Sequence, residues 1–216
     1  MEIPKPNEGG GDFELAPTGT HLALCYRVID LGTQESIWEG QTKQAHKVLI
    51  GWELPDEKMS DGRPFMIQQR YTWSMHEKAT LRKHLEAWRG TAFVDKDFGK
   101  GGFDIKNILG KPCVISIVHA EHNGKTYANI FGVGKLMKGQ AVPPQVNPSV
   151  YLWLHKDRWE KSVYAFLTDG LKNTIAKSPE YKELAAPSIT PGDDGARVMP
   201  QRADMDDVIP FAPEFR

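Results

Sequence analysis

The sequence has few cysteines, no long apolar run and no excess of charge of one sign. Only Cys25 and Cys113 are cysteines, and both lie in apolar, strand-like stretches. This placement favours buried thiols in a reducing compartment over a disulfide framework. No segment is apolar for the length of a membrane span, and the first residues contain no apolar run behind a basic one. We therefore expect a cytoplasmic protein with no membrane partner.

The sequence also lacks the residue patterns of common catalytic and metal sites. No glycine-rich phosphate loop ends in a Lys-Ser or Lys-Thr pair after a strand, and no cysteine pair has zinc spacing. The glycine-rich segment 99–103 is interpreted as a flexible loop. His119, Glu121 and His122 cluster beside a turn and are interpreted as solvent-facing polar residues. We expect a binding protein rather than an enzyme, with no catalytic residue, metal or cofactor.

The formal charge of −1 is unevenly distributed along the chain. Residues 187–216 contain six acids and three arginines, a net charge of −3, which leaves 24 cations and 22 acids, a net charge of +2, in the rest. The composition of this tail, rich in Pro, Gly, Asp and Ala, predicts disorder. A mildly basic body with an acidic tail recurs among nucleic-acid-binding proteins.

Two predicted strands between Lys43 and Gly90 contain a mixture of aromatic and basic residues. The first strand contains Lys43, Lys47 and Trp52, and the second contains Phe65, Arg70, Tyr71 and Trp73. Single-stranded nucleic acid requires this mixture, because phosphates bind cations and unpaired bases stack on flat rings. The alternative is a half-buried sheet in which Trp and Tyr belong to the core and the cations are solvated.

Hydrophobic periodicity predicts five strands and one central helix. The predicted strands cover residues 20–31, 43–54 and 64–74, followed by a hairpin over 112–136 that turns at Asn123-Gly124. A capping box formed by Ser74 and Glu77 predicts the start of a helix. Its buried stripe is Leu81, Leu85 and Trp88, and Gly90 is expected to end it.

The order of three strands, one helix and two strands is that of the OB-fold, a five-stranded barrel. An open five-stranded sheet gives the same order, so the pattern leaves barrel closure undecided. The residues flanking this core add further parts. We expect an N-terminal arm (1–19), an OB-fold domain (20–141), a linker with a helical appendage that packs on the barrel (142–186), and an acidic tail (187–216).

Four stretches, HKVLIGWEL, RYTWSMHEKATLRKHLEAWRG, FDIKNILGKPC and LKNTIAKSPEY, resemble a family of bacteriophage and prophage single-stranded DNA-binding proteins. The resemblance covers most of residues 1–181. It implies an OB-fold that binds single-stranded DNA without sequence preference during phage replication or recombination, in the cytoplasm of the bacterial host cell.

The tail carries a second resemblance, in Asp206, Asp207, Ile209, Pro210 and Phe211. These residues are similar to the acidic tip of bacterial single-strand binding proteins, which recruits replication and repair proteins. The resemblance implies that the tail binds phage or host replication and recombination proteins. Two departures weaken the match: Val208 is inserted before Ile209, and five residues follow Phe211.

Because OB-folds bind nucleic acid across strands two and three, the DNA-binding residues are predicted there and on the last strand. They are Lys43, Lys47, Trp52, Arg63, Phe65, Arg70, Tyr71, Trp73 and Tyr127. Strand alternation places Arg70 and Tyr71 on opposite faces, so one of them is expected in the core. The alternative function is a recombination accessory or regulatory module that binds protein with the same fold. The sequence is also compatible with assembly into a homo-oligomer.

Overall fold

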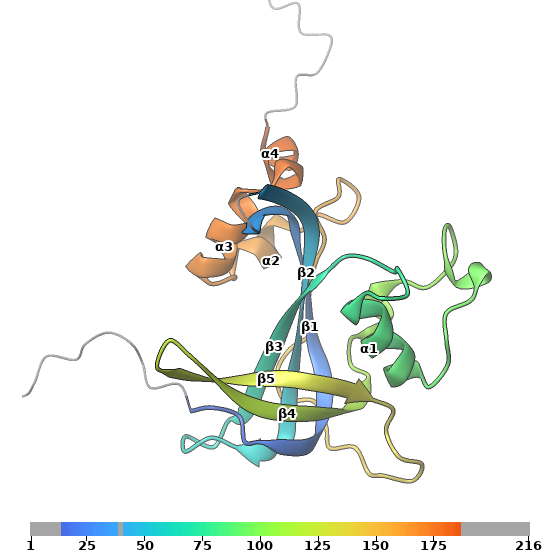
Figure 1. The fold of residues 1–216 in the computed structure, drawn as a ribbon, viewed down its shortest axis with the longest axis vertical. Helices are drawn as coiled ribbons and strands as arrows, with labels where there is room; N and C mark the ends of the chain where they lie inside the picture. The colour runs from blue at the N-terminus through green and yellow to red at the C-terminus, as the bar shows by residue number, and fades with distance from the viewer. Residues whose placement is uncertain (1–13, 39–40, 187–216) are drawn as a thin grey trace, which may run out of the picture. The chain divides into compact units, whose positions relative to one another are not determined.

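A six-stranded sheet dominates the computed structural model, which describes residues 14–38 and 41–186 (Figure 1). Its strands are β1 (Gly19–Trp38), β2 (Gln41–Lys58), β3 (Pro64–Thr72), β4 (Pro112–His122), β5 (Lys125–Gly134) and β6 (Val150–Leu152). The order is β3-β2-β1-β4-β5 in antiparallel pairs, and β6 pairs parallel with β1. The fold is mainly β, as predicted. The sheet is open, because β3 and β5 share no ladder within the described residues.

Strands β1 and β2 extend further than the sequence predicts. Residues 32–38, expected to be a loop, continue β1 and pair with β2 up to Trp38 opposite Gln41. A register shift between Asp30 and Gly32 lets the strand bend there, and Gly32 has a φ of 68°. The β4–β5 hairpin was predicted correctly: Asn123 and Gly124 both have positive φ, as a tight type I′ turn requires.

Helix α1 (Thr80–Arg89) lies between β3 and β4 in the chain, as predicted. Leu81, Leu85 and Trp88 are buried, and Gly90 ends the helix in the left-handed conformation. The predicted stripe therefore packs against the sheet, where the rings of Trp88 and Trp52 lie 6.1 Å apart.

The predicted start of this helix was wrong. The helix begins at Thr80 after Ala79, and no side chain caps it. The Ser74 hydroxyl instead accepts a hydrogen bond from the His76 backbone N–H, so Ser74 and Glu77 form no capping box. Residues 74–79 precede the helix as a turn-containing segment, and Arg82 of the helix donates to the Met75 carbonyl oxygen in it.

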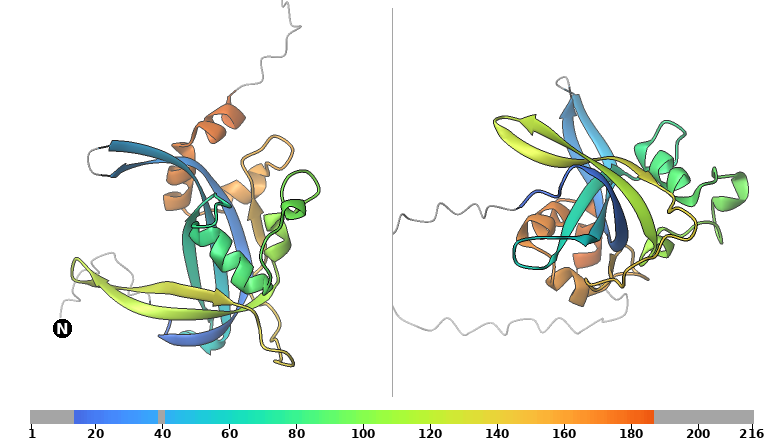
Figure 2. Two further views of the ribbon diagram at one scale, coloured as in Figure 1. Left: turned by 45° about the vertical axis from the view of Figure 1, so that its right-hand side comes forward. Right: turned by 90° about the horizontal axis from the view of Figure 1, so that it is seen from below.

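Three short helices follow β6: α2 (Lys161–Ala165), α3 (Asp169–Ala176) and α4 (Pro179–Ala185). The sequence predicts one helical stretch over 159–177, but Ser178 caps a separate helix α4 by accepting from the Tyr181 N–H. These helices cover a second face of β1 and β2 (Figure 2), where Leu171 and Ile175 pack with Ile29 and Leu49. Both faces of β1 and β2 are therefore buried here.

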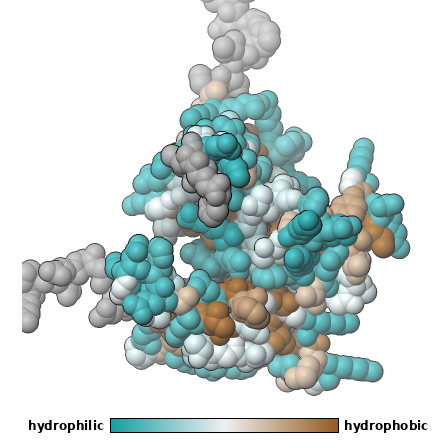
Figure 3. All heavy atoms as spheres, in the orientation of Figure 1, coloured by the Kyte–Doolittle hydropathy of each residue, from teal (hydrophilic) through white to brown (hydrophobic). Residues whose placement is uncertain are grey.

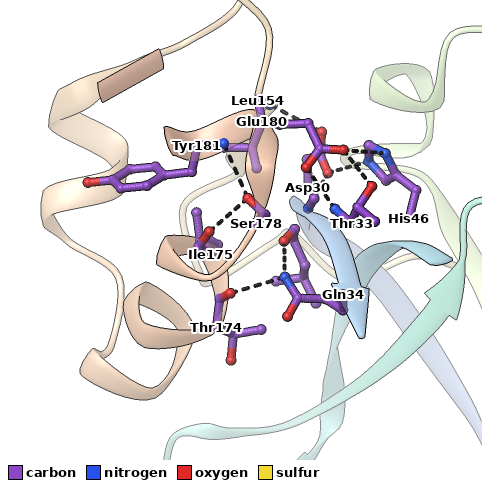
Figure 4. A network of polar contacts seen from close by, with 12 residues as sticks. Asp30, Thr33, Gln34, His46, Leu154, Thr174, Ile175, Ser178, Glu180 and Tyr181 are labelled. Atoms are coloured by element: carbon purple, nitrogen blue, oxygen red, sulfur yellow. Dashed lines mark hydrogen bonds and ion pairs between the residues drawn. The ribbon is translucent and has the colours of Figure 1, made fainter. Parts of the chain in front are cut away.

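A polar network fastens α4 and the segment after β6 to the sheet (Figure 4). Asp30 is fully buried, and its carboxylate accepts from the backbone N–H of Gly32 and Leu154 and lies 2.6 Å from His46 Nε2. Glu180 of α4 accepts from the Thr33 backbone and hydroxyl and lies 3.5 Å from His46 Nδ1. His46 therefore bridges two carboxylates.

We expect the contribution of His46 to stability to depend on pH. The hydrogen bond to Asp30 raises the pKa of His46, although burial opposes it. A raised folded-state pKa means that the contribution is complete below the ordinary value of 6.5 and is lost as pH rises through the folded-state pKa. The free energy of unfolding in urea should be higher for wild type than for His46→Gln, and this difference should be larger at about pH 6 than at about pH 9.

His155→Gln is the control, because His155 is exposed and lies outside this network, so its urea midpoint should stay close to that of wild type. A difference between wild type and His46→Gln that stays constant with pH would contradict the role given to His46.

The predicted tail, with Asp206, Asp207, Ile209, Pro210 and Phe211, lies outside the described residues, as does most of the predicted N-terminal arm. Between residues 14 and 186, with 39–40 excepted, no helix is long and apolar enough to cross a membrane.

Candidate nucleic-acid interface

A basic groove of about 510 Å³ lies where β3 ends and α1 begins. We call it the cationic groove. It is lined by Lys47, Gln69, Arg70, Tyr71, Thr72, Ser74, His76, Lys78, Ala79, Thr80 and Leu81. The lining contains three permanent cations and no acid, so its potential favours an anion.

The three cations come from three different parts of the chain. Lys47 leaves β2 opposite Thr72 of β3, and its ammonium donates to the Thr72 hydroxyl over 2.7 Å. Arg70 is exposed on β3, and Lys78 is exposed in the turns before α1. Among the described residues, neither the Arg70 guanidinium nor the Lys78 ammonium has a hydrogen-bond or ion-pair partner, although the Lys78 backbone N–H donates to His76 Nδ1. The Arg70 guanidinium and the Lys78 ammonium therefore remain available to bind phosphate.

The first turn of α1 adds partial positive charge at one end of the groove. Ala79, Thr80 and Leu81 line it, and the helix has neither a side-chain cap nor an acid in its first turn. The first N–H groups of a helix have no partner within the helix and carry partial positive charge. This end of α1 thus supplements the three cations.

Tyr71 fixes the wall between β3 and α1. Its hydroxyl lies 2.9 Å from His84 Nδ1 of α1, and the two rings meet edge to face. Burial raises the pKa of Tyr71 and lowers that of His84, so both groups are neutral near pH 7. The wall is therefore built by packing and by one neutral hydrogen bond.

Three predicted DNA-binding aromatics are core side chains. Trp52, Phe65 and Tyr71 are all buried within the main hydrophobic cluster. Burial leaves these rings little surface on which a base could stack, and their assignment to DNA binding stays a prediction. Their strand faces point inward because α1 and β4 cover that side of the sheet. The expectation that Arg70 and Tyr71 point to opposite faces is confirmed.

Other predicted residues lie away from the cationic groove. Lys43 is exposed on a part of β2 that pairs only with β1 within the described residues. Arg63 pairs with Asp61 in the β2–β3 loop. Tyr127 lies on β5 and is exposed, as are Val118 of β4 and Phe131 of β5. Figure 3 shows an apolar patch in the region of these two strands. Trp73 follows β3 and lines a neighbouring hollow.

Sequence reasoning missed Lys78 and His76 because the helix was expected to start at Ser74. That start placed Lys78 on a helical flank with Arg82 and Arg89. Arg82 and Arg89 are instead structural: they pair with Glu86 and Asp97 and hold the loop after α1. No capping side chain marks the start at Thr80, so no local sequence signal placed Lys78 before the helix.

The fold and the groove define the protein as a mainly β, single-sheet protein with a basic edge groove. Comparison with known proteins adds no family, since no family model and no curated protein matches the chain.

Proposed function

We propose that this chain is an OB-type, single-stranded DNA-binding protein that acts in phage replication or recombination. The observation that carries the proposal is the cationic groove, in which Lys47, Arg70, Lys78 and the uncapped start of α1 surround one hollow without an acid. A single strand offers phosphates to such a groove without regard to base sequence. The resemblance in the four quoted stretches supports the same function.

The strand arrangement supports the OB-type assignment. Strand β1 is central and pairs with both β2 and β4, and α1 connects β3 to β4. OB-folds are partly open barrels with binding surfaces on strands two and three. The cationic groove uses residues of β2 and β3, which is the expected location.

We expect the triple variant Lys47→Ala, Arg70→Ala and Lys78→Ala to lose about 100-fold in affinity for oligo(dT) at low salt. Each phosphate contact to a single strand contributes about 0.7 to the slope of log K against log salt, so the slope should fall by about 2. Fluorescence anisotropy of a labelled oligo(dT) at several salt concentrations measures both quantities.

A matched control removes three other exposed lysines, Lys58, Lys138 and Lys161, which do not line the groove. This control changes net charge equally and should lower affinity only slightly. Equal losses in the two triple variants would show that net charge, and not the groove, governs binding.

The alternative is a regulatory or recombination accessory module that binds protein. It predicts that the wild-type chain does not bind oligo(dT) at low salt. Recruitment of phage or host proteins by the tail remains a proposal based on its sequence alone.

A further inference from the structure

A second hollow, of about 460 Å³, lies on the other side of Trp73 from the cationic groove. Thr72 and Ser74 line the cationic groove, whereas Trp73 between them lines this hollow. Its other walls come from the loop 99–105, from Trp153 just after β6, and from Arg158. We call it the tryptophan hollow. Consecutive residues of the chain therefore line the two hollows.

Trp73 presents an aromatic ring that the fold leaves partly uncovered. Its exposed fraction is 36%, although it lies edge to face with Trp153 at 4.9 Å. Trp153 is itself nearly parallel to Tyr151, with ring centroids 6.2 Å apart, and stacks with His46 at 6.3 Å. The network around Asp30 and His46 therefore holds Trp153, and Trp153 holds the ring of Trp73.

Part of the wall is a loop with three glycines, at positions 99, 101 and 102. Gly99 and Gly101 have φ values of 77° and 84°, and a Cβ at either would meet no atom within 4 Å. A Cβ at Gly102 would overlap the Asp97 carbonyl oxygen, so this position needs glycine for close backbone approach. The hollow beside the partly exposed ring of Trp73 therefore has room for a planar group next to this loop.

The charges around the hollow favour a negatively charged ligand. Asp104 is its only acidic lining residue, and its carboxylate pairs with Arg158 at 3.2 Å. Arg158 also donates to the Tyr151 hydroxyl over 3.2 Å. Lys100 on the glycine loop has no partner among the described residues. One positive charge therefore remains, beside the ring that a base would cover.

We propose that the tryptophan hollow binds one nucleobase, stacked on Trp73, of the same single strand whose phosphates lie in the cationic groove. This inference rests on the proposed function. Trp73 is the stacking residue, Trp153 positions it, and Lys100 contacts the phosphate that follows the base. The single strand then passes around the end of β3, with its backbone on one side and a base on the other.

The test compares oligo(dT) with an abasic oligonucleotide of equal length, which has the same phosphates and no bases. Trp73→Leu keeps apolar contact with Trp153 but removes the stacking surface. We expect it to lower oligo(dT) affinity about 10-fold, within the range for loss of one stacked base, and to leave abasic affinity unchanged. Trp73→Phe should retain most of the difference between the two ligands.

Phe166→Leu is the matched control, since Phe166 is an exposed aromatic residue in the C-terminal part and lines neither hollow. It should change neither affinity. Thermal unfolding of each variant checks that the fold is intact.

The outcomes separate this inference from the function on which it rests. If Trp73→Leu leaves oligo(dT) binding unchanged while the cationic-groove variant weakens it, the base site is refuted and the proposed function stands. Equal losses for oligo(dT) and the abasic strand would also refute the base site. If the wild-type chain binds neither ligand, the proposed function fails and the base site with it.

Discussion

Replacing Gly32 by alanine is expected to destabilise the protein by about 2–5 kcal/mol, through backbone strain and overpacking together. Gly32 has a φ of 68°, which L side chains rarely adopt. A Cβ there would also overlap the side chain of Ser178, which is fully buried, and lie 2.8 Å from Glu180 Oε2. Because Ser178 begins α4, the clash acts where the C-terminal helices meet β1.

Gly62 provides the matched control for this prediction. Its φ is 83°, but a Cβ there would meet nothing within 4 Å. Gly62→Ala should therefore cost only the strain of the positive φ, about 1 kcal/mol. Urea unfolding of the two variants measures the difference. Similar losses in both would show that α4 yields easily and that its contact with Gly32 contributes little to stability.

Asp30→Ala is expected to cost about 3–5 kcal/mol, because removing one member of a buried ionic network leaves its partners without compensation. The backbone N–H groups of Gly32 and Leu154 would lose their acceptor, and His46 would lose the closer of its two carboxylates. Asp30 is completely buried, so water does not replace the lost bonds easily.

Asp61→Ala tests whether any lost carboxylate has this effect. Asp61 also accepts from a backbone N–H and pairs with Arg63, but it is exposed. Its removal should leave the urea midpoint nearly unchanged, since solvent screens exposed pairs. If Asp30→Ala proves equally mild, the network in Figure 4 is not what fastens the C-terminal helices.

Loss of this network should also reach the tryptophan hollow. His46 stacks with Trp153, and Leu154, the next residue, donates to Asp30. The position of Trp73 against Trp153 therefore depends on contacts made by residues far from it in the sequence, such as Leu154. Stability of the C-terminal part and geometry of the hollow are linked by the same few atoms.

Local signals in the sequence determined several elements of this protein. The spacing of Leu81, Leu85 and Trp88 identified the buried face of α1, and Gly90 marked its end. Asn123-Gly124 identified the β4–β5 hairpin. Such features depend on neighbours within a few residues, since helix periodicity, left-handed glycines and tight turns are short-range properties. The mainly β class follows from the same patterns.

Only the tertiary structure decided which surface is free. The sequence could not separate core from surface in β2 and β3, because C-terminal helices cover one face of β1 and β2 and α1 covers the other. Trp52 and Tyr71 are therefore buried, whereas Arg70 meets Lys47 and Lys78 in one groove. Likewise, Trp73 and Trp153 are 80 positions apart and become neighbours only through packing. Both hollows are formed by long-range contacts, which short sequence patterns do not predict.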